Sequence, residues 1–315
     1  MSTRLFVLLA RKGDAGVVLR RGPSKQVLLL RWDLKRDSFE AGQWLKGRVY
    51  ERRCDLSPSG DRLVYFAASY RGPYQTWTAV SRPPYFSALA LWPKGDAWGG
   101  GGFFSSENEL LLNHPPTQRA MAPGFSIPRK LRVDALPDAG SGEDAPLFEQ
   151  RLRRDGWKLV QSGTWVEQGR AARLWIKCDP PEVWSKPHPM RSISCRLLMQ
   201  TEGIKEKDGP WYVTSYRVQR DDGANALDLG RADWADWSSM GDLLFAKEGR
   251  LFRVSLTSRK GFDPEASTRQ LVDLNSLKFE PREAPPDAKS WFGKTPTGTL
   301  VEQDSSRSAR LNRRR

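Results

Sequence analysis

The feature that most constrains this sequence is a run of short strands and tight turns between residues 232 and 254. A polar turn at 238–241 ends in glycine and is followed by the apolar run 243–246. A second turn at 247–249 places glycine where a positive φ is needed. Residues 251–254 then have the pattern of the next strand. Successive strands joined this tightly predict an all-β fold.

A second copy of the pattern lies at residues 54–80. Its turn reads Ser57, Pro58, Ser59, Gly60 and precedes the apolar run 63–66. A Gly-Pro turn at 72–73 then leads into another predicted strand at 74–80. A degraded copy, Pro-Lys-Gly-Asp, follows the apolar run 87–92 at residues 93–96. The chain therefore repeats a strand–turn–strand unit.

The two clear copies read Leu-Ser-Pro-Ser-Gly-Asp-Arg-Leu-Val-Tyr-Phe and Trp-Ser-Ser-Met-Gly-Asp-Leu-Leu-Phe. They resemble the blade signature of WD-repeat-like bacterial β-propellers of the TolB type, although Ser59 and Met240 stand where that family has Asp or Pro. The resemblance implies four-stranded antiparallel blades. At about 40–45 residues a blade, the length suits six or seven of them. Because this fold serves many functions, the resemblance implies little about activity.

The domain boundaries follow from where the strand pattern is interrupted. We expect a single propeller domain over residues 1–280, with a strand at 4–10 and a final strand at 268–274. Six prolines between 114 and 146 predict a long surface loop insertion at about 114–147 that includes a strand near 130–136. Residues 148–157 have the pattern of a helix. Residues 281–315 are rich in Pro, Ser, Gly and charge, which predicts an extended or disordered basic tail.

The net charge of +14 favours anionic partners. Residues 1–53 hold 13 Lys or Arg and 5 Asp or Glu, and the last nine residues hold five Arg and no acid. These two regions are candidates for salt-sensitive contact with phosphates. The candidate nucleic-acid-binding residues are Arg20, Arg21, Lys25, Arg307, Arg310, Arg313, Arg314 and Arg315.

The cysteines indicate no metal or disulfide framework. Cys54, Cys178 and Cys195 are odd in number and far apart, which is typical of a reducing cytoplasm. Cys178, Cys195 and His188 could supply zinc ligands, but the close Cys pair typical of structural zinc sites is missing. We therefore expect no metal and no cofactor. No apolar run reaches about 18 residues, so we expect no membrane partner.

No sequence motif indicates a set of catalytic residues. His114 and His188 both lie beside prolines in predicted loops. Asp233 and Asp236 could act in acid–base chemistry, but such acids more often fix turns by accepting backbone N–H bonds. The glycines at 99–102 are followed by two phenylalanines, which excludes a phosphate-binding P-loop and predicts a flexible loop. We assign no catalytic residue.

Most of the 13 tryptophans are expected in the core. Those in predicted loops are candidates for exposed contact with a partner, since aromatic side chains are enriched at interfaces. They are Trp44, Trp98, Trp184 and Trp291, of which we assign the first three to partner binding.

Together these features favour a non-catalytic interaction module or scaffold that binds a protein partner. A nucleic-acid-associated protein that uses the basic N-terminal region and the Arg-rich tail is the alternative. A hydrolase or lyase with carboxylates at a central channel is a second alternative. The sequence predicts neither the partner nor the oligomeric state.

Overall fold

The computed structural model describes residues 3–22, 25–256, 267–294 and 298–301. About 48% of the described residues are in strands, and α1 (Ala145–Arg154) is the one α-helix among them. The prediction of an all-β fold is therefore confirmed. The strands form five sheets, and no closed propeller is detected among the described residues, so the propeller and its blade count stay predictions.

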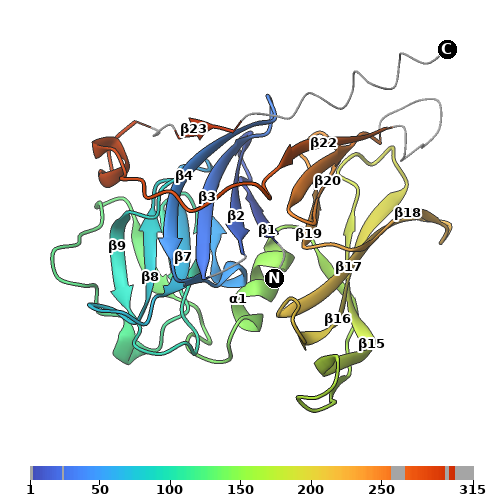
Figure 1. Ribbon diagram of the computed structural model, residues 1–315, viewed down its shortest axis with the longest axis horizontal. Helices are drawn as coiled ribbons and strands as arrows, with labels where there is room; N and C mark the ends of the chain where they lie inside the picture. Colours follow the sequence, from blue (N-terminus) through green and yellow to red (C-terminus); the bar gives the residue numbers. More distant parts are fainter. Residues whose placement is uncertain (1–2, 23–24, 257–266, 295–297, 302–315) are drawn as a thin grey trace. The chain divides into compact units, whose positions relative to one another are not determined.

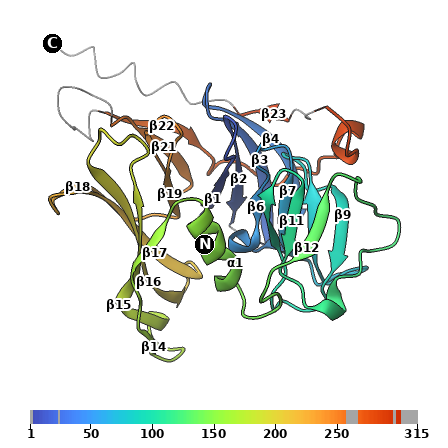
Figure 2. The same cartoon turned by 180° about the vertical axis from the view of Figure 1, so that it is seen from behind.

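The chain divides into two compact units, a division that the sequence patterns did not predict. The N-terminal unit comprises Phe6–Asp155 and Lys278–Leu300, and the C-terminal unit comprises Met1–Leu5, Gly156–Leu277 and Val301–Arg315. Figures 1 and 2 show the strands of the N-terminal unit in blue to green, apart from β23 in red, and those of the C-terminal unit mainly in yellow to orange.

Three sheets build the N-terminal unit. The first has the order β1-β2-β3-β4-β23, the second the order β5-β7-β8-β9 with β6 also paired to β7, and the third the order β10-β11-β12. The strands are β1 (Arg4–Leu9), β2 (Ala15–Arg21), β3 (Gln26–Asp33), β4 (Ser38–Lys46), β5 (Arg48–Val49), β6 (Asp55–Leu56), β7 (Leu63–Ala68), β8 (Thr76–Ser81), β9 (Ala88–Pro93), β10 (Gly102–Ser106), β11 (Glu109–Leu112), β12 (Arg132–Ala135) and β23 (Thr299–Leu300).

The second sheet is buried on both faces, and β7 shows why. Every residue of its sequence, Leu-Val-Tyr-Phe-Ala-Ala, is buried. Because side chains alternate along a strand, Leu63 and Tyr65 join a cluster with β2 and β3, whereas Val64 packs with Phe104 of β10. A continuous apolar strand is typical of a sheet covered on both sides. The sheet is thus the rigid centre of this unit.

Two antiparallel sheets build the C-terminal unit. One has the order β13-β15-β16-β17-β18 with β14 also paired to β15, and the other has the order β19-β20-β21-β22. The strands are β13 (Lys158–Gln161), β14 (Trp165–Glu167), β15 (Leu174–Pro187), β16 (Cys195–Glu206), β17 (Tyr212–Arg220), β18 (Asn225–Arg231), β19 (Trp234–Trp237), β20 (Leu243–Lys247), β21 (Arg250–Val254) and β22 (Thr268–Asp273).

The two clear motif copies form the same kind of turn, one in each unit. Between β6 and β7, the Gly60 N–H donates to the Ser57 carbonyl at 2.9 Å, and between β19 and β20 the Gly241 N–H donates to the Ser238 carbonyl at 3.0 Å. Both glycines have φ +87. Each serine hydroxyl also accepts a backbone N–H from the start of the next strand. The degraded copy at 93–96 follows the last strand of its sheet and occupies no equivalent position.

Segments expected at the surface contribute to the core of the N-terminal unit. Ala122, Leu131 and Leu136 are buried, so residues 114–147 pack against the sheets, although the strand expected near 130–136 is confirmed as β12. The segment expected to begin a disordered tail at 281 also packs here. Ala284 and Ala288 are buried against Tyr85, and β23 pairs with β4. Residues 302–315 lie outside the described part.

The glycines at 99–102 were expected to form a flexible loop, and the structure contradicts this. Gly99, Gly100 and Gly101 all have positive φ, between +69 and +83, and pack closely against the core. A Cβ on Gly101 would lie 2.2 Å from the Arg53 carbonyl oxygen. The Gly101 N–H also donates to the Thr78 hydroxyl at 2.7 Å. Glycine is required here because the backbone is left-handed and closely covered.

We therefore expect Gly101→Ala to lower the free energy of unfolding by about 2–3 kcal/mol, since left-handed strain of about 1–2 kcal/mol adds to a clash with backbone. Gly95→Ala is the matched control, because Gly95 has φ +85 but no atom within 4 Å of an added Cβ. Urea unfolding should show the smaller loss for Gly95→Ala. Equal losses would mean that the close packing contributes nothing.

Helix α1 begins three residues before the predicted start, at Ala145, and confirms the predicted helix. Leu147, Phe148 and Leu152 are buried on one face, as the sequence spacing indicated. The same helix supplies Arg151, which is also buried and donates to the Cys54 carbonyl.

Candidate binding cleft

An open cleft of about 490 Å³ lies on the N-terminal unit, where β4 meets the strands and loops of the second sheet. Its volume is within the usual range for ligand sites. Six aromatic side chains line it, and Lys46 and Arg71 are the charged residues among the described ones that line it. The aromatic residues are Trp44, Tyr65, Tyr74, Trp77, Phe86 and Phe125.

The floor of the cleft is part of the main core. Tyr65 and Phe86 are buried, and half-buried Tyr74, Trp77 and Phe125 pack against the same cluster. The Tyr65 hydroxyl donates to the Phe86 carbonyl at 2.5 Å. Burial raises the pKa of Tyr65, and a hydrogen bond from the Trp77 side chain acts against that rise. The rings are therefore held in place before any ligand arrives.

Trp44 lies on the β4 side of the cleft, and its ring contacts two other side chains of the N-terminal unit. The Arg20 guanidinium carbon lies 5.4 Å from the Trp44 ring centroid, and the Phe279 ring centroid lies 5.8 Å away at a tilt of 60°. The Lys46 ammonium lies 4.6 Å from the centroid of Phe279. Phe279, which follows β22 in the chain, thus packs against the wall of the cleft.

Among the described residues that line the cleft there is no Asp or Glu. Other cations of the surrounding strands and loops pair with acids outside the cleft, such as Arg62 with Glu107 and Lys94 with Asp96. Lys46 and Arg71 are exposed at the cleft. The site therefore suits an anionic ligand with flat rings.

The basic residues predicted to bind phosphates do not form one patch. Arg20 is only 1% exposed and donates to the Gly22 carbonyl, so its predicted role as a phosphate contact is wrong; it supports Trp44 instead. Both carboxylate oxygens of Glu51 accept from Arg21 at 2.8 Å, which neutralises that cation. Lys25 is exposed. The tail residues Arg307, Arg310, Arg313, Arg314 and Arg315 lie outside the described residues.

The three tryptophans assigned to partner binding have different environments. Trp44 lines the cleft, in β4 rather than in a loop. Trp98 is 56% exposed and lies outside the cleft. Trp184 is fully buried in β15, where its indole N–H donates to Glu182 at 2.9 Å, so its assignment as an exposed contact is wrong. Trp291 donates to the Ser126 carbonyl at 2.9 Å.

The histidines singled out in the sequence are bonded within the fold. The His114 ring contacts the Thr78 hydroxyl at 2.7 Å and the Gln118 carbonyl at 2.8 Å. The His188 ring lies 2.8 Å from the Gly241 carbonyl and packs edge-on against Trp237. Both rings are thus held by neighbouring groups of their own units.

The three cysteines are buried and free of disulfides. Burial raises the pKa of Cys54 to about 12 and that of Cys195 to about 11, and it also raises the pKa of Cys178. They are therefore protonated thiols at neutral pH, a poor state for a nucleophile or metal ligand. Within the described ranges, no group of three or more His, Cys, Asp or Glu could hold a metal ion.

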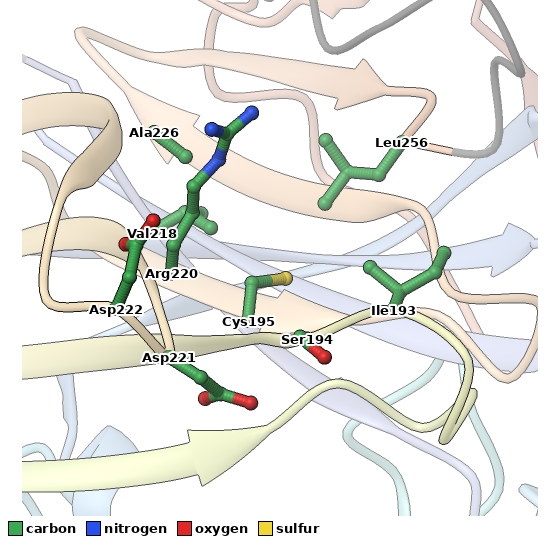
Figure 3. Close-up of a pocket in the computed structure, with 9 residues that line it drawn as sticks. All are labelled: Ile193, Ser194, Cys195, Val218, Arg220, Asp221, Asp222, Ala226 and Leu256. Carbon is green, nitrogen blue, oxygen red and sulfur yellow. The ribbon is translucent and has the colours of Figure 1, made fainter.

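A second hollow, of about 380 Å³, lies in the C-terminal unit at the end of the sheet where β16 begins and β17 ends (Figure 3). Its walls include Cys195, Val218 and Leu256, and Figure 3 shows the Arg220 and Asp221 side chains pointing to opposite sides. Asp221 accepts from Arg196 at 2.6 Å, and Asp222 accepts the Ala224 N–H at 2.9 Å. Because these acids are engaged by their own chain, the hollow offers less for recognition than the cleft.

Sequence reasoning missed most of the cleft. Trp77 was expected in the core with most of the tryptophans, and Tyr74, Phe125, Lys46 and Arg71 were not singled out. The available signal was a cation close in sequence to an aromatic residue, as in Lys46 after Trp44 and Arg71 before Tyr74.

Comparisons with protein-family models, with curated proteins and with solved structures found no match. In the part of the chain that is described, no helix is long and apolar enough to cross a membrane. The functional argument therefore rests on the geometry of the cleft.

Proposed function

We propose that this chain is a non-catalytic binding module whose recognition surface is the aromatic cleft of the N-terminal unit. The observation that carries the proposal is the combination of six aromatic side chains with Lys46 and Arg71 in one cleft whose described lining residues include no acid. Aromatic rings fixed on a core bind with little loss of conformational entropy. The sequence favours a protein partner first and a nucleic acid second, and both classes have aromatic-lined recognition sites.

The hydrolase or lyase alternative has less support. Of the acids singled out for such chemistry, Asp236 accepts from the Lys186 ammonium at 2.6 Å and from the Trp237 N–H at 2.7 Å. These bonds match the role of fixing local structure. The cleft itself contains no acid that could serve as a general base.

We also propose that the antiparallel sheets are blade-like units of the WD-repeat-like, TolB-type kind. Two observations support this: the sheets follow one another along the chain, and both motif copies form their glycine turn between the first strands of a sheet. The parallel pairing of β11 with β12 departs from a propeller blade.

An affinity pull-down from native lysate tests the binding proposal. We expect full-length protein to recover a partner that Tyr74→Leu and Trp77→Leu each lose, because both changes remove a ring from the cleft. Trp98→Leu removes an exposed ring outside the cleft and should keep the partner. A partner that resists nuclease would be a protein, and one lost with nuclease would be a nucleic acid or bound through one.

The result against the proposal would be recovery of the same partners by all three variants. The partner would then bind elsewhere on the chain. Trp77 packs against the core, so Trp77→Leu could lose its partner because the protein unfolds. Thermal melting of each variant shows whether it is still folded in the pull-down.

A further inference from the structure

Resting on the binding function proposed above, we propose that the ligand of the cleft is a single-stranded nucleic acid. Its bases would stack on the aromatic rings, and its phosphates would contact Lys46 and Arg71. Aromatic platforms beside a cationic groove are the combination by which proteins hold single strands without reading sequence.

The first support is charge. Phosphates carry a negative charge at every nucleotide, and the charged side chains that line the cleft in the described part of the chain, Lys46 and Arg71, are both positive. Proline-rich peptides also dock in aromatic grooves, but their recognition needs no such excess of positive charge. The wall composition therefore favours the nucleic acid.

The second support is the placement of the rings. Tyr74 and Trp77 project from the loop before β8 and from β8 itself, and Phe125 approaches from the segment 113–131. All three are half-buried, so each keeps part of its surface open while the rest packs on the core. Base stacking needs such an open face, and bases offer theirs only when a strand is unpaired.

The third support is that the cations stand next to the rings. Arg71 lies in the same loop as Tyr74, and Lys46 ends β4 beside Trp44. Lys46 is held over Phe279 at 4.6 Å, so its ammonium is positioned beside the cleft. A base on a ring would thus place its phosphate within the field of a cation.

The test measures binding of the full-length protein to a labelled single-stranded oligonucleotide of about 12 nucleotides, a length within the range of known single-strand sites. RNA and DNA forms, a duplex of the same length and an uncharged proline-rich peptide complete the set of probes. We expect the single strands to bind more tightly than the duplex. Tyr74→Leu and Trp77→Leu should each weaken single-strand binding by about 5-fold to 150-fold.

The salt dependence gives a second readout. The double variant Lys46→Gln, Arg71→Gln should reduce the slope of log K against log salt by about 1.4, which is about 0.7 for each lost phosphate contact. The matched control is Lys12→Gln, Lys35→Gln, which removes two exposed lysines of the same unit outside the cleft. It should change the slope less than the cleft pair.

Three results would overturn the inference. If the cleft variants keep full affinity and substitution of the five tail arginines abolishes it, the single strand binds the tail. If the proline-rich peptide binds and depends on Tyr74 and Trp77 whereas the oligonucleotides do not bind, the cleft is a peptide groove and the binding module stands. If no probe binds and the pull-down is also insensitive to the cleft, both proposals fail.

Discussion

Replacing Asp55 by alanine should lower the free energy of unfolding by about 3–5 kcal/mol, the usual loss when one partner of a buried ion pair is removed. The Asp55 side chain is 3% exposed. Its carboxylate accepts from Arg154 at 2.6 and 2.9 Å and from the Phe104 N–H at 2.8 Å. In the variant, the Arg154 guanidinium would lose its main counterion while 15% exposed.

A double variant tests whether the loss comes from the missing pair or from the cation that is left behind. In Asp55→Ala, Arg154 keeps Asp155 as its one ion-pair partner among the described residues, at 2.8 Å. Asp55→Ala combined with Arg154→Met removes both charges of the buried pair, and it should be more stable than Asp55→Ala alone because no cation with a lost partner remains. Asp138→Ala, at an exposed acid of the same unit, should stay within about 0.5 kcal/mol of the parent. Chemical denaturation measures the free energy of unfolding of the parent and of the three variants. A loss below about 1 kcal/mol for Asp55→Ala would show that the pair adds little.

This ion pair also explains how helix α1 is attached. Arg151, Arg154 and Arg53 reach between the helix and the second and third sheets, and Arg53 pairs with Asp144 immediately before the helix. A sequence pattern identifies the apolar face of such a helix, since that depends on residues three or four apart. It does not identify ion-pair partners about a hundred residues apart, because these depend on the tertiary fold.

The sequence predicted correctly those turns whose geometry is determined by local hydrogen bonds. The turns after Ser57 and Ser238 were predicted because serine, glycine and a following apolar run determine them together. The prediction was wrong where the environment of a residue depends on pairing between strands that are distant in the sequence. Trp184 was placed in a loop because prolines surround it, yet pairing with Met199 of β16 makes it a buried strand residue.

The candidate site was predicted only in part for the same reason. Trp44 was chosen as a contact residue and does line the cleft. Arg20 was chosen for its charge, but a residue of β2 can lie under another side chain, and the sequence does not show that Trp44 covers it. Trp77 was assigned to the core because it is in a strand. It does pack against the core cluster but is only half-buried, and local patterns do not specify how far the tertiary fold covers a side chain.

The second large effect that we expect is a loss of stability in mild acid that depends on His114. Burial lowers the pKa of His114 to about 4. Its Nδ1 must carry the proton donated to the Gln118 carbonyl, so Nε2 accepts from the Thr78 hydroxyl, which itself accepts the Gly101 N–H. A second proton on Nε2 would remove that acceptor. The hydrogen bond to the Gln118 carbonyl and the charge of Asp96 act against this lowering of the pKa, and the charges of Lys94 and Arg119 add to it.

The sign follows from linkage. In the unfolded chain a histidine has a pKa of about 6.5, so the unfolded state binds a proton first as the pH falls. The stability that neutral His114 contributes is therefore complete above about pH 6.5 and is lost as the pH falls toward 4. The loss of unfolding free energy amounts to about 3 kcal/mol once the pH is below the pKa of His114 in both the unfolded and the folded state.

Urea unfolding of the parent and of His114→Gln, from neutral pH to about pH 4, measures this contribution. We expect the variant to be less stable at neutral pH, because the ring packs in the core, and to lose less stability than the parent as the pH falls. Subtracting the two curves removes the carboxylates that also titrate, such as Asp96 and Glu107, whose pKa values are lowered. Parallel curves between pH 6.5 and 4 would mean that His114 does not couple protonation to folding, and the bonding order from Gly101 through Thr78 to His114 would have to be revised.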